Sequence, residues 1–150
     1  MHPLQILIDD VTWAGQNLSY NLKFIADDKL AWKPAPTAKS ALEICSEVVG
    51  VCRSIPKVMS GEGGEMEFPV FTTREEAQAA IKSATEDYAA YLGTLQPGDL
   101  EGEIAMPFGP TPKKMLIGMP VTDAIHHHGQ IAYIQMLLGD TTSHFEMFGT

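Results

Sequence analysis

The sequence predicts an all-α protein built as a four-helix bundle. Four segments carry apolar residues at three- and four-residue steps, which is the periodicity of a helix with one buried face. Stretches that contain glycine and proline separate these segments. Four helices around one core is the simplest arrangement that buries all four apolar faces. The 150 residues are enough for one domain, and we expect a single domain over 1–150.

The first two helices follow from apolar spacing and from proline. The first is expected over about 3–26 and should end before the proline-containing stretch 32–36, because each proline favours extended backbone in the residue before it. The second is expected over about 39–59. Pro56 falls late in that pattern, so we expect a kink there or an early end of the helix.

The third helix has a clear start signal. Thr73 and Glu76 form the pattern of a capping box, in which the hydroxyl caps the helix and the carboxylate bonds back to the cap. The helix should run from there to about residue 95. A long, irregular connection over 100–112 follows, and 103–106 within it alternates as a short strand or hairpin arm would.

The fourth helix is expected over 121–138, or from residue 112 with a kink at Pro120. Gly139 is a natural residue to end it. Phe145, Met147 and Phe148 make the tail apolar, so we expect it to pack on the bundle or on a second subunit.

Composition and charge argue against several classes of function. The net charge is -9, and the longest basic run is Lys113-Lys114, so nucleic-acid and anionic-membrane binding are not expected. No apolar run reaches the roughly 20 residues of a bilayer span. Cys45 and Cys52 are seven positions apart, about 10.5 Å along a helix and too far for a disulfide. Two reduced thiols and the lack of a basic signal region predict a cytoplasmic protein.

Three polar side chains are the candidates for chemistry. Asp123 and His127 are four positions apart in the last predicted helix, so both project from one face. Glu47 lies inside the apolar stripe of the second helix, where a carboxylate is costly unless it is paired, protonated or bound to a cation. All three are acceptable metal ligands, and side chains from two helices can converge on one ion inside a bundle.

Two interpretations of these residues stay open. In the first, Glu47, Asp123 and His127 lie together and hold a divalent cation. In the second, His127 is a neutral core histidine bonded to Asp123, and Glu47 is in water at the mouth of the bundle. In both, His126 and His128 point about 100° to either side of His127. Because close carboxylates repel, the first interpretation predicts that the cation-free protein melts lower at pH 8 than at pH 5.5.

The last predicted helix contains HHHGQI at 126–131, followed by Tyr133 and Leu138-Gly139, and this motif resembles the last helix of the DinB-like superfamily. Earlier, LAWKPAP at 30–36 and SALEI at 40–44 resemble that family's entry into its second helix. The resemblance spans about 4–139. It implies a four-helix bundle of the DinB-like type, here with a long irregular connection between the third and fourth helices.

The resemblance also implies a metal site. Members usually hold a divalent metal with three histidines, one on the second helix and two four positions apart on the last. By position these fall on Glu47, Asp123 and His127, so only His127 keeps the family residue. Two carboxylates still bind divalent cations but shift the preference from zinc or nickel toward harder ions such as manganese, iron(II) or magnesium.

Two classes of function follow from the resemblance. The first is a metal-dependent small-molecule or thiol transferase that uses the metal as a Lewis acid and a low-molecular-weight thiol as partner. The second is a non-catalytic four-helix bundle with a degenerate metal site, which binds a ligand or only itself. A homodimer is expected in addition, because the tail is apolar and Gly129 inside the last helix suggests the close approach of another backbone.

Overall fold

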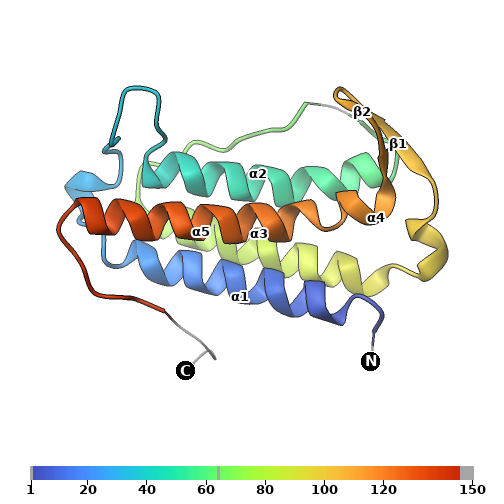
Figure 1. Ribbon diagram of the computed structural model, residues 1–150, viewed down its shortest axis with the longest axis horizontal. Coiled ribbons are helices and arrows are strands. Elements are labelled where there is room, and N and C mark those ends of the chain that lie inside the picture. Colours follow the sequence, from blue (N-terminus) through green and yellow to red (C-terminus); the bar gives the residue numbers. More distant parts are fainter. Residues whose placement is uncertain (1, 64, 146–150) are drawn as a thin grey trace.

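The computed structural model describes residues 2–63 and 65–145, and four long helices form its bundle (Figure 1). The long helices and a short one before the last are α1 (Gln5–Leu22), α2 (Ala41–Met59), α3 (Arg74–Thr94), α4 (Lys113–Leu116) and α5 (Met119–Leu137). Two 3-10 turns, η1 (Asp27–Lys29) and η2 (Pro97–Leu100), and a hairpin of β1 (Glu103–Met106) and β2 (Gly109–Pro112) complete it. The predicted all-α four-helix bundle is confirmed.

Each of α1 and α2 packs against both α3 and α5, so the helices stand at the corners of a square. Figure 1 shows that residues 65–73 run back along the length of the bundle before α3 begins, so α2 and α3 point in the same direction. The long, irregular connection after the third helix is not what breaks the up-and-down pattern of the bundle. The crossover between α2 and α3 breaks it instead, and the connection after α3 only turns the chain at one end of the bundle.

The helix starts agree with the capping signals. Thr73 and Glu76 form the predicted capping box of α3. Ser40 and Glu43 form a second box at α2: the Ser40 hydroxyl accepts from the Glu43 N–H, and the Glu43 carboxylate accepts from the Ser40 N–H. This box fixes where α2 begins, and thereby sets the direction in which the later residues of the helix point.

Two prolines lie inside the helices. Of the kink or early end expected at Pro56, the early end is wrong: α2 continues to Met59, and the carbonyl of Pro56 accepts from the N–H of Ser60. Pro120 is not the site of the predicted kink. The chain breaks at residues 117–118, between α4 and α5, and Pro120 then lies in the first turn of α5, where its missing N–H costs little.

The hairpin confirms the expected strand at 103–106. Its two strands are antiparallel, with Glu103 opposite Pro112 and Met106 opposite Gly109. Gly109 has a φ of 119°, which glycine adopts without strain and which closes the tight turn between the strands. The hairpin leads directly into α4.

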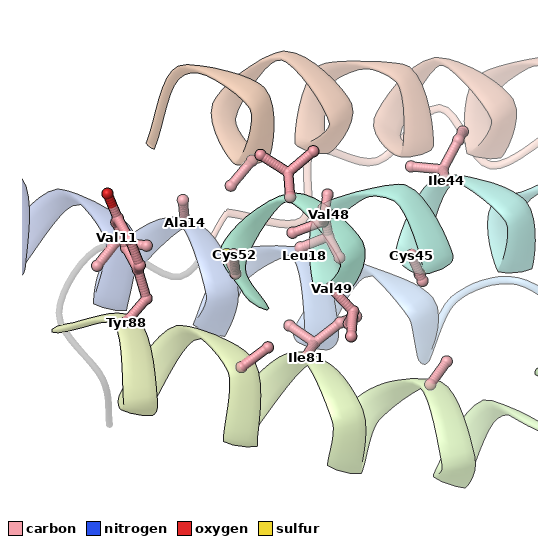
Figure 2. Packing of buried hydrophobic residues seen from close by; sticks show 14 of the residues in the cluster. Val11, Ala14, Leu18, Ile44, Cys45, Val48, Val49, Cys52, Ile81 and Tyr88 are labelled. Atoms are coloured by element: carbon pink, nitrogen blue, oxygen red, sulfur yellow. The ribbon is translucent and has the colours of Figure 1, made fainter. Parts of the chain in front are cut away.

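One apolar core fills the space between the helices. Figure 2 shows Val11 and Leu18 of α1, Val48 of α2 and Ile81 and Tyr88 of α3 within it. The Tyr88 hydroxyl donates to the carbonyl of Ile117 at 2.7 Å, which ties α3 to the break before α5. Among the described residues, no helix is both long and apolar enough to cross a bilayer.

Both cysteines are free, as expected, and both are buried in this core. Burial raises the pKa of Cys45 to about 12. For Cys52, burial and then the negative charge of Asp123 raise the pKa to about 12 as well. Both thiols are therefore protonated at neutral pH and act as packing groups.

The tail packs on its own chain as far as the structure describes it. The ring of Phe145 lies edge-on to Trp13, with 5.3 Å between ring centroids, and also approaches His128. The expectations for Met147 and Phe148 lie outside the described residues. Because the contacts of Phe145 are within the chain, the homodimer stays a prediction.

Alanine substitutions at two glycines should have opposite effects on the free energy of unfolding. A Cβ on Gly15 would lie 2.6 Å from Oγ1 and 2.8 Å from Cγ2 of Thr85, a short, buried side chain that cannot move aside. Nothing lies within 4 Å of a Cβ on Gly129, so the close backbone approach expected there is wrong for the described chain. Gly15→Ala should lower the free energy of unfolding by about 1–3 kcal/mol, and Gly129→Ala should raise it by up to about 1 kcal/mol. Urea denaturation measures both; equal effects would contradict the α1–α3 contact.

Candidate metal site between α2 and α5

The structure brings the three predicted residues together. Glu47 lies on α2, one turn after the capping residue Glu43, and Asp123 and His127 lie one turn apart on α5. The Nε2 atom of His127 is 3.2 Å from Oε2 of Glu47 and 3.3 Å from Oδ1 of Asp123. The His127 side chain is only 5% exposed, whereas Glu47 and Asp123 are 29% and 23% exposed. One imidazole nitrogen therefore faces two carboxylates at the edge of the core.

A fourth polar group shares this cluster. The ammonium of Lys39, in the loop before α2, contacts Oε2 of Glu47, the same oxygen that His127 contacts. Lys39 was not predicted, because its place depends on the conformation of the loop that leads into α2. The signal that could have found it is its position directly before the Ser40 cap, which anchors the end of this loop.

One carboxylate oxygen of the cluster has no partner. Oδ2 of Asp123 is buried and makes no hydrogen bond, whereas Oδ1 faces His127. A buried carboxylate oxygen without a partner is costly. Among the described residues, no three or more His, Cys, Asp or Glu side chains form a ready-made metal-binding group. The distances from Nε2 of His127 to the oxygens of Glu47 and Asp123, 3.2 and 3.3 Å, are nevertheless close to the spacing of metal ligands. Donor atoms about 2.1 Å from one tetrahedral ion lie roughly 3.4 Å apart.

Gln130 orients the imidazole of His127. Its carbonyl oxygen lies 2.6 Å from Nδ1 of His127, and a carbonyl oxygen can only accept, so Nδ1 carries a proton. The amide nitrogen of Gln130 donates to Nε2 of His126 at 3.1 Å, which fixes the orientation of the amide. In a neutral His127 the lone pair is therefore on Nε2, the atom that faces both carboxylates. Such a partner is typical of a metal-binding histidine.

The same contacts control the protonation of His127. Burial lowers the pKa of His127, but hydrogen bonds to Asp123 and Gln130 and the charges of Asp123 and Glu47 raise it more, and the net shift is upward. An imidazolium on His127 donates from both nitrogens and partly neutralises the two carboxylates. The repulsion we expected between them is thus relieved by His127 when no cation is bound.

The cation-free protein should lose stability between pH 5.5 and pH 8. Because the pKa of His127 is raised on folding, its contribution is complete below the unfolded value of about 6.5 and is lost as the pH rises through the higher folded value. The measurement is the melting temperature of EDTA-treated protein across this range, for wild type and His127→Gln. The difference between the two proteins should shrink as the pH rises.

A control is needed because His128 changes the pH dependence of stability in the opposite direction. Burial lowers the pKa of His128, so its contribution increases with pH up to the unfolded value. The His127→Gln comparison removes only the first effect. Parallel pH profiles for wild type and His127→Gln would contradict the assigned interactions.

Of the neighbouring histidines, His128 points away from the cluster as predicted, whereas His126 stays beside it, with its ring 5.2 Å from that of His127 and on the wall of the same pocket. His128 is buried on the α1 side, where its Nε2 accepts a hydrogen bond from Asn21 at 3.1 Å and its ring lies edge-on to Trp13. His126 is exposed and contacts Gln130. Of the three consecutive histidines, only His127 faces Asp123.

A pocket opens beside the cluster. It has a volume of about 820 Å³, within the range of small-molecule sites, and Glu47, Asp123 and His127 line it. Further walls come from the 34–39 loop and from α5, and Gly129 adds open space there because it has no side chain. The cluster is therefore accessible to a small molecule.

The comparisons with known proteins concern the fold. No family model matches the chain, and no curated protein matches it by sequence. The bundle is similar to a DinB-like protein from Bacillus subtilis, with a TM-score of 0.71, 19% identity, and coverage of 92% of this chain and 95% of that protein. A DinB-like protein from Bacillus cereus gives a TM-score of 0.68 at 19% identity, covering 85% of this chain and 87% of that one.

A third similar structure is the mycothiol-dependent maleylpyruvate isomerase. Its TM-score is 0.54 at 15% identity, and the match covers 86% of this chain but 60% of the isomerase. At these identities the likeness establishes the fold. The predicted fold, a four-helix bundle of the DinB-like type, is thus confirmed.

Proposed function

We propose that the protein binds a divalent cation through Glu47, Asp123 and His127. The observation that supports this most is the position of His127 Nε2, at 3.2 and 3.3 Å from carboxylate oxygens of two different helices. The partnerless oxygen of Asp123 supplies one more donor atom beside them. With two carboxylates and one imidazole, manganese, iron(II) and magnesium are the preferred ions, and zinc or nickel is the alternative.

Each residue has a defined part in this proposal. Glu47 and Asp123 supply negative oxygen donors, and Nε2 of His127 supplies a neutral nitrogen once its proton has left. Gln130 holds His127 in the required tautomer by accepting from Nδ1. A bound cation would supply Lewis-acid chemistry to a small molecule in the adjacent 820 Å³ pocket.

The activity proposed for this site is a metal-dependent reaction of a small molecule, with a low-molecular-weight thiol as co-substrate. The isomerase of similar fold is mycothiol-dependent, which supports a thiol as the first candidate to test. The protein's own thiols are unsuited to that role, because Cys45 and Cys52 are buried and protonated. The thiol would therefore come from solution.

The alternative is a non-catalytic bundle in which the cluster is a hydrogen-bonded remnant. The contacts that favour it are those of Lys39 and His127 with Glu47, which leave that carboxylate partnered without any cation. In that case the pocket would bind a ligand without metal, or the protein would bind only itself.

Elemental analysis and calorimetry separate these two functions. Purified protein is analysed for bound metal, then stripped with EDTA and titrated with manganese or zinc. We expect one ion per chain for wild type and none for the double variant Glu47→Gln/Asp123→Asn.

A matched control comes from the tail. Asp140 and His144 are four positions apart like Asp123 and His127, with 2.7 Å between Oδ2 and Nε2, but within the described part of the chain no second carboxylate pairs with His144. Asp140→Asn should therefore bind metal as wild type does. Wild-type protein that takes up no ion in the titration would leave the hydrogen-bonded remnant as the function of the cluster.

A further inference from the structure

Lys39 and the proposed cation require the same carboxylate. The Lys39 ammonium contacts Oε2 of Glu47, and the side chain is about half exposed at the mouth of the bundle. It lines the 820 Å³ pocket and also a neighbouring pocket of about 400 Å³. A cation bound by Glu47 would weaken the pairing with Lys39, and the ammonium would remain at the boundary between the two pockets.

The cluster becomes positively charged when a divalent cation binds. Without the cation, Glu47, Asp123 and Lys39 together carry one negative charge, which an imidazolium on His127 cancels; the cation takes the place of that proton. A divalent cation converts this to one positive charge, close to walls of low polarity. A net charge in such surroundings favours a counter-ion.

Lys39 is the group placed to bind that counter-ion. Among the described residues that line the larger pocket, it is the only one with a permanent positive charge. The start of α2 is nearby, but the capping box uses the N–H groups of Ser40 and Glu43, and the N–H of Leu42 donates to the carbonyl of Leu30. The pocket walls include Ile44, Tyr133 and Ile134, which can cover an apolar body of a ligand.

We propose that binding of the cation frees Lys39 to hold the anionic group of a small ligand. The ligand class is a monoanion, a carboxylate or a thiolate, with an apolar body that fits the pocket. Lys39 is then a specificity-determining residue, and the anion binds well only after the cation has bound. This inference rests on the proposed metal site and deepens it.

Benzoate is the test anion and benzamide its neutral counterpart. Each is titrated into the wild-type protein with and without cobalt(II), by calorimetry and by the visible absorption of the cobalt. We expect benzoate to bind the loaded protein at least about tenfold more tightly than the metal-free protein. Lys39→Met should weaken benzoate binding about tenfold without changing the binding of benzamide, and it should tighten cobalt binding severalfold because a competing cation is gone.

Lys33 provides the matched control. It is also about half exposed and also pairs with a glutamate of α2, Glu43, at 2.6 Å, but it does not line the larger pocket. Lys33→Met should leave both affinities unchanged, and Lys39→Arg should keep benzoate binding because the charge remains.

The outcomes are distinct. Equal benzoate affinity for loaded wild type and Lys39→Met, or equal affinity with and without cobalt, would overturn the role of Lys39 while the metal site stands. A wild-type protein that binds no cobalt before any anion is added would overturn the metal site itself, and this inference with it.

Discussion

Replacing His127 with leucine is expected to lower the free energy of unfolding of the metal-free protein by about 2–4 kcal/mol near pH 6. Removing one partner of a buried ion pair typically costs about 3–5 kcal/mol, and the partial exposure of Glu47 and Asp123 reduces that cost. The variant keeps a side chain of similar size, so the loss comes from the carboxylates and not from a cavity. Urea denaturation in EDTA measures it.

The double variant Asp123→Leu/His127→Leu tests the cause. An apolar pair should recover most of the lost stability, because neither charged partner is then left alone in the core. Glu47 should keep its contact with Lys39 in both variants, because neither substitution removes either partner. If the double variant is less stable than His127→Leu, the leucines disturb packing and the electrostatic explanation is wrong.

Metal should stabilise the wild-type protein by about 2.7 kcal/mol when the free ion is at a hundredfold excess over its dissociation constant. For a chain of this size, that corresponds to a rise in melting temperature of about 5–10 °C. The rise should be larger at pH 8 than at pH 5.5, because a proton on Nε2 of His127 competes with the ion. Differential scanning fluorimetry with manganese and zinc measures it.

The double variant Glu47→Gln/Asp123→Asn should show no rise, and Asp140→Asn should show the full rise. Both leave the size of the side chains unchanged, so packing is preserved. A similar rise in all three proteins would place the ion elsewhere on the acidic surface.

Most of the helices could be predicted from the sequence, because their signals are local. Capping at Thr73 and the apolar periodicity each depend on residues within one or two turns. The direction of α3 could not be predicted in this way. It depends on the course of residues 65–73, where Phe68 packs against Gly50 of α2, a contact between distant positions.

In the candidate site, too, the features with local signals could be predicted and those that depend on distant parts of the chain could not. The spacing of Asp123 and His127 and the place of Glu47 in an apolar stripe predicted correctly that the three would meet. The involvement of Lys39 was missed, because it depends on a loop whose conformation has no periodic signal. The prediction for Gly129 was wrong for a different reason. A glycine inside a helix suggested a closely packed neighbour, but this position of α5 faces the open pocket.

Anomalous diffraction from crystals grown with manganese tests the metal site most directly. We predict a single strong peak between α2 and α5, at about 2.0–2.3 Å from a carboxylate oxygen of Glu47, from one of Asp123 and from Nε2 of His127. The Lys39 ammonium should then have moved away from Glu47. A cluster without a peak in crystals soaked at millimolar manganese, with Lys39 and His127 still on Glu47, would contradict the metal site.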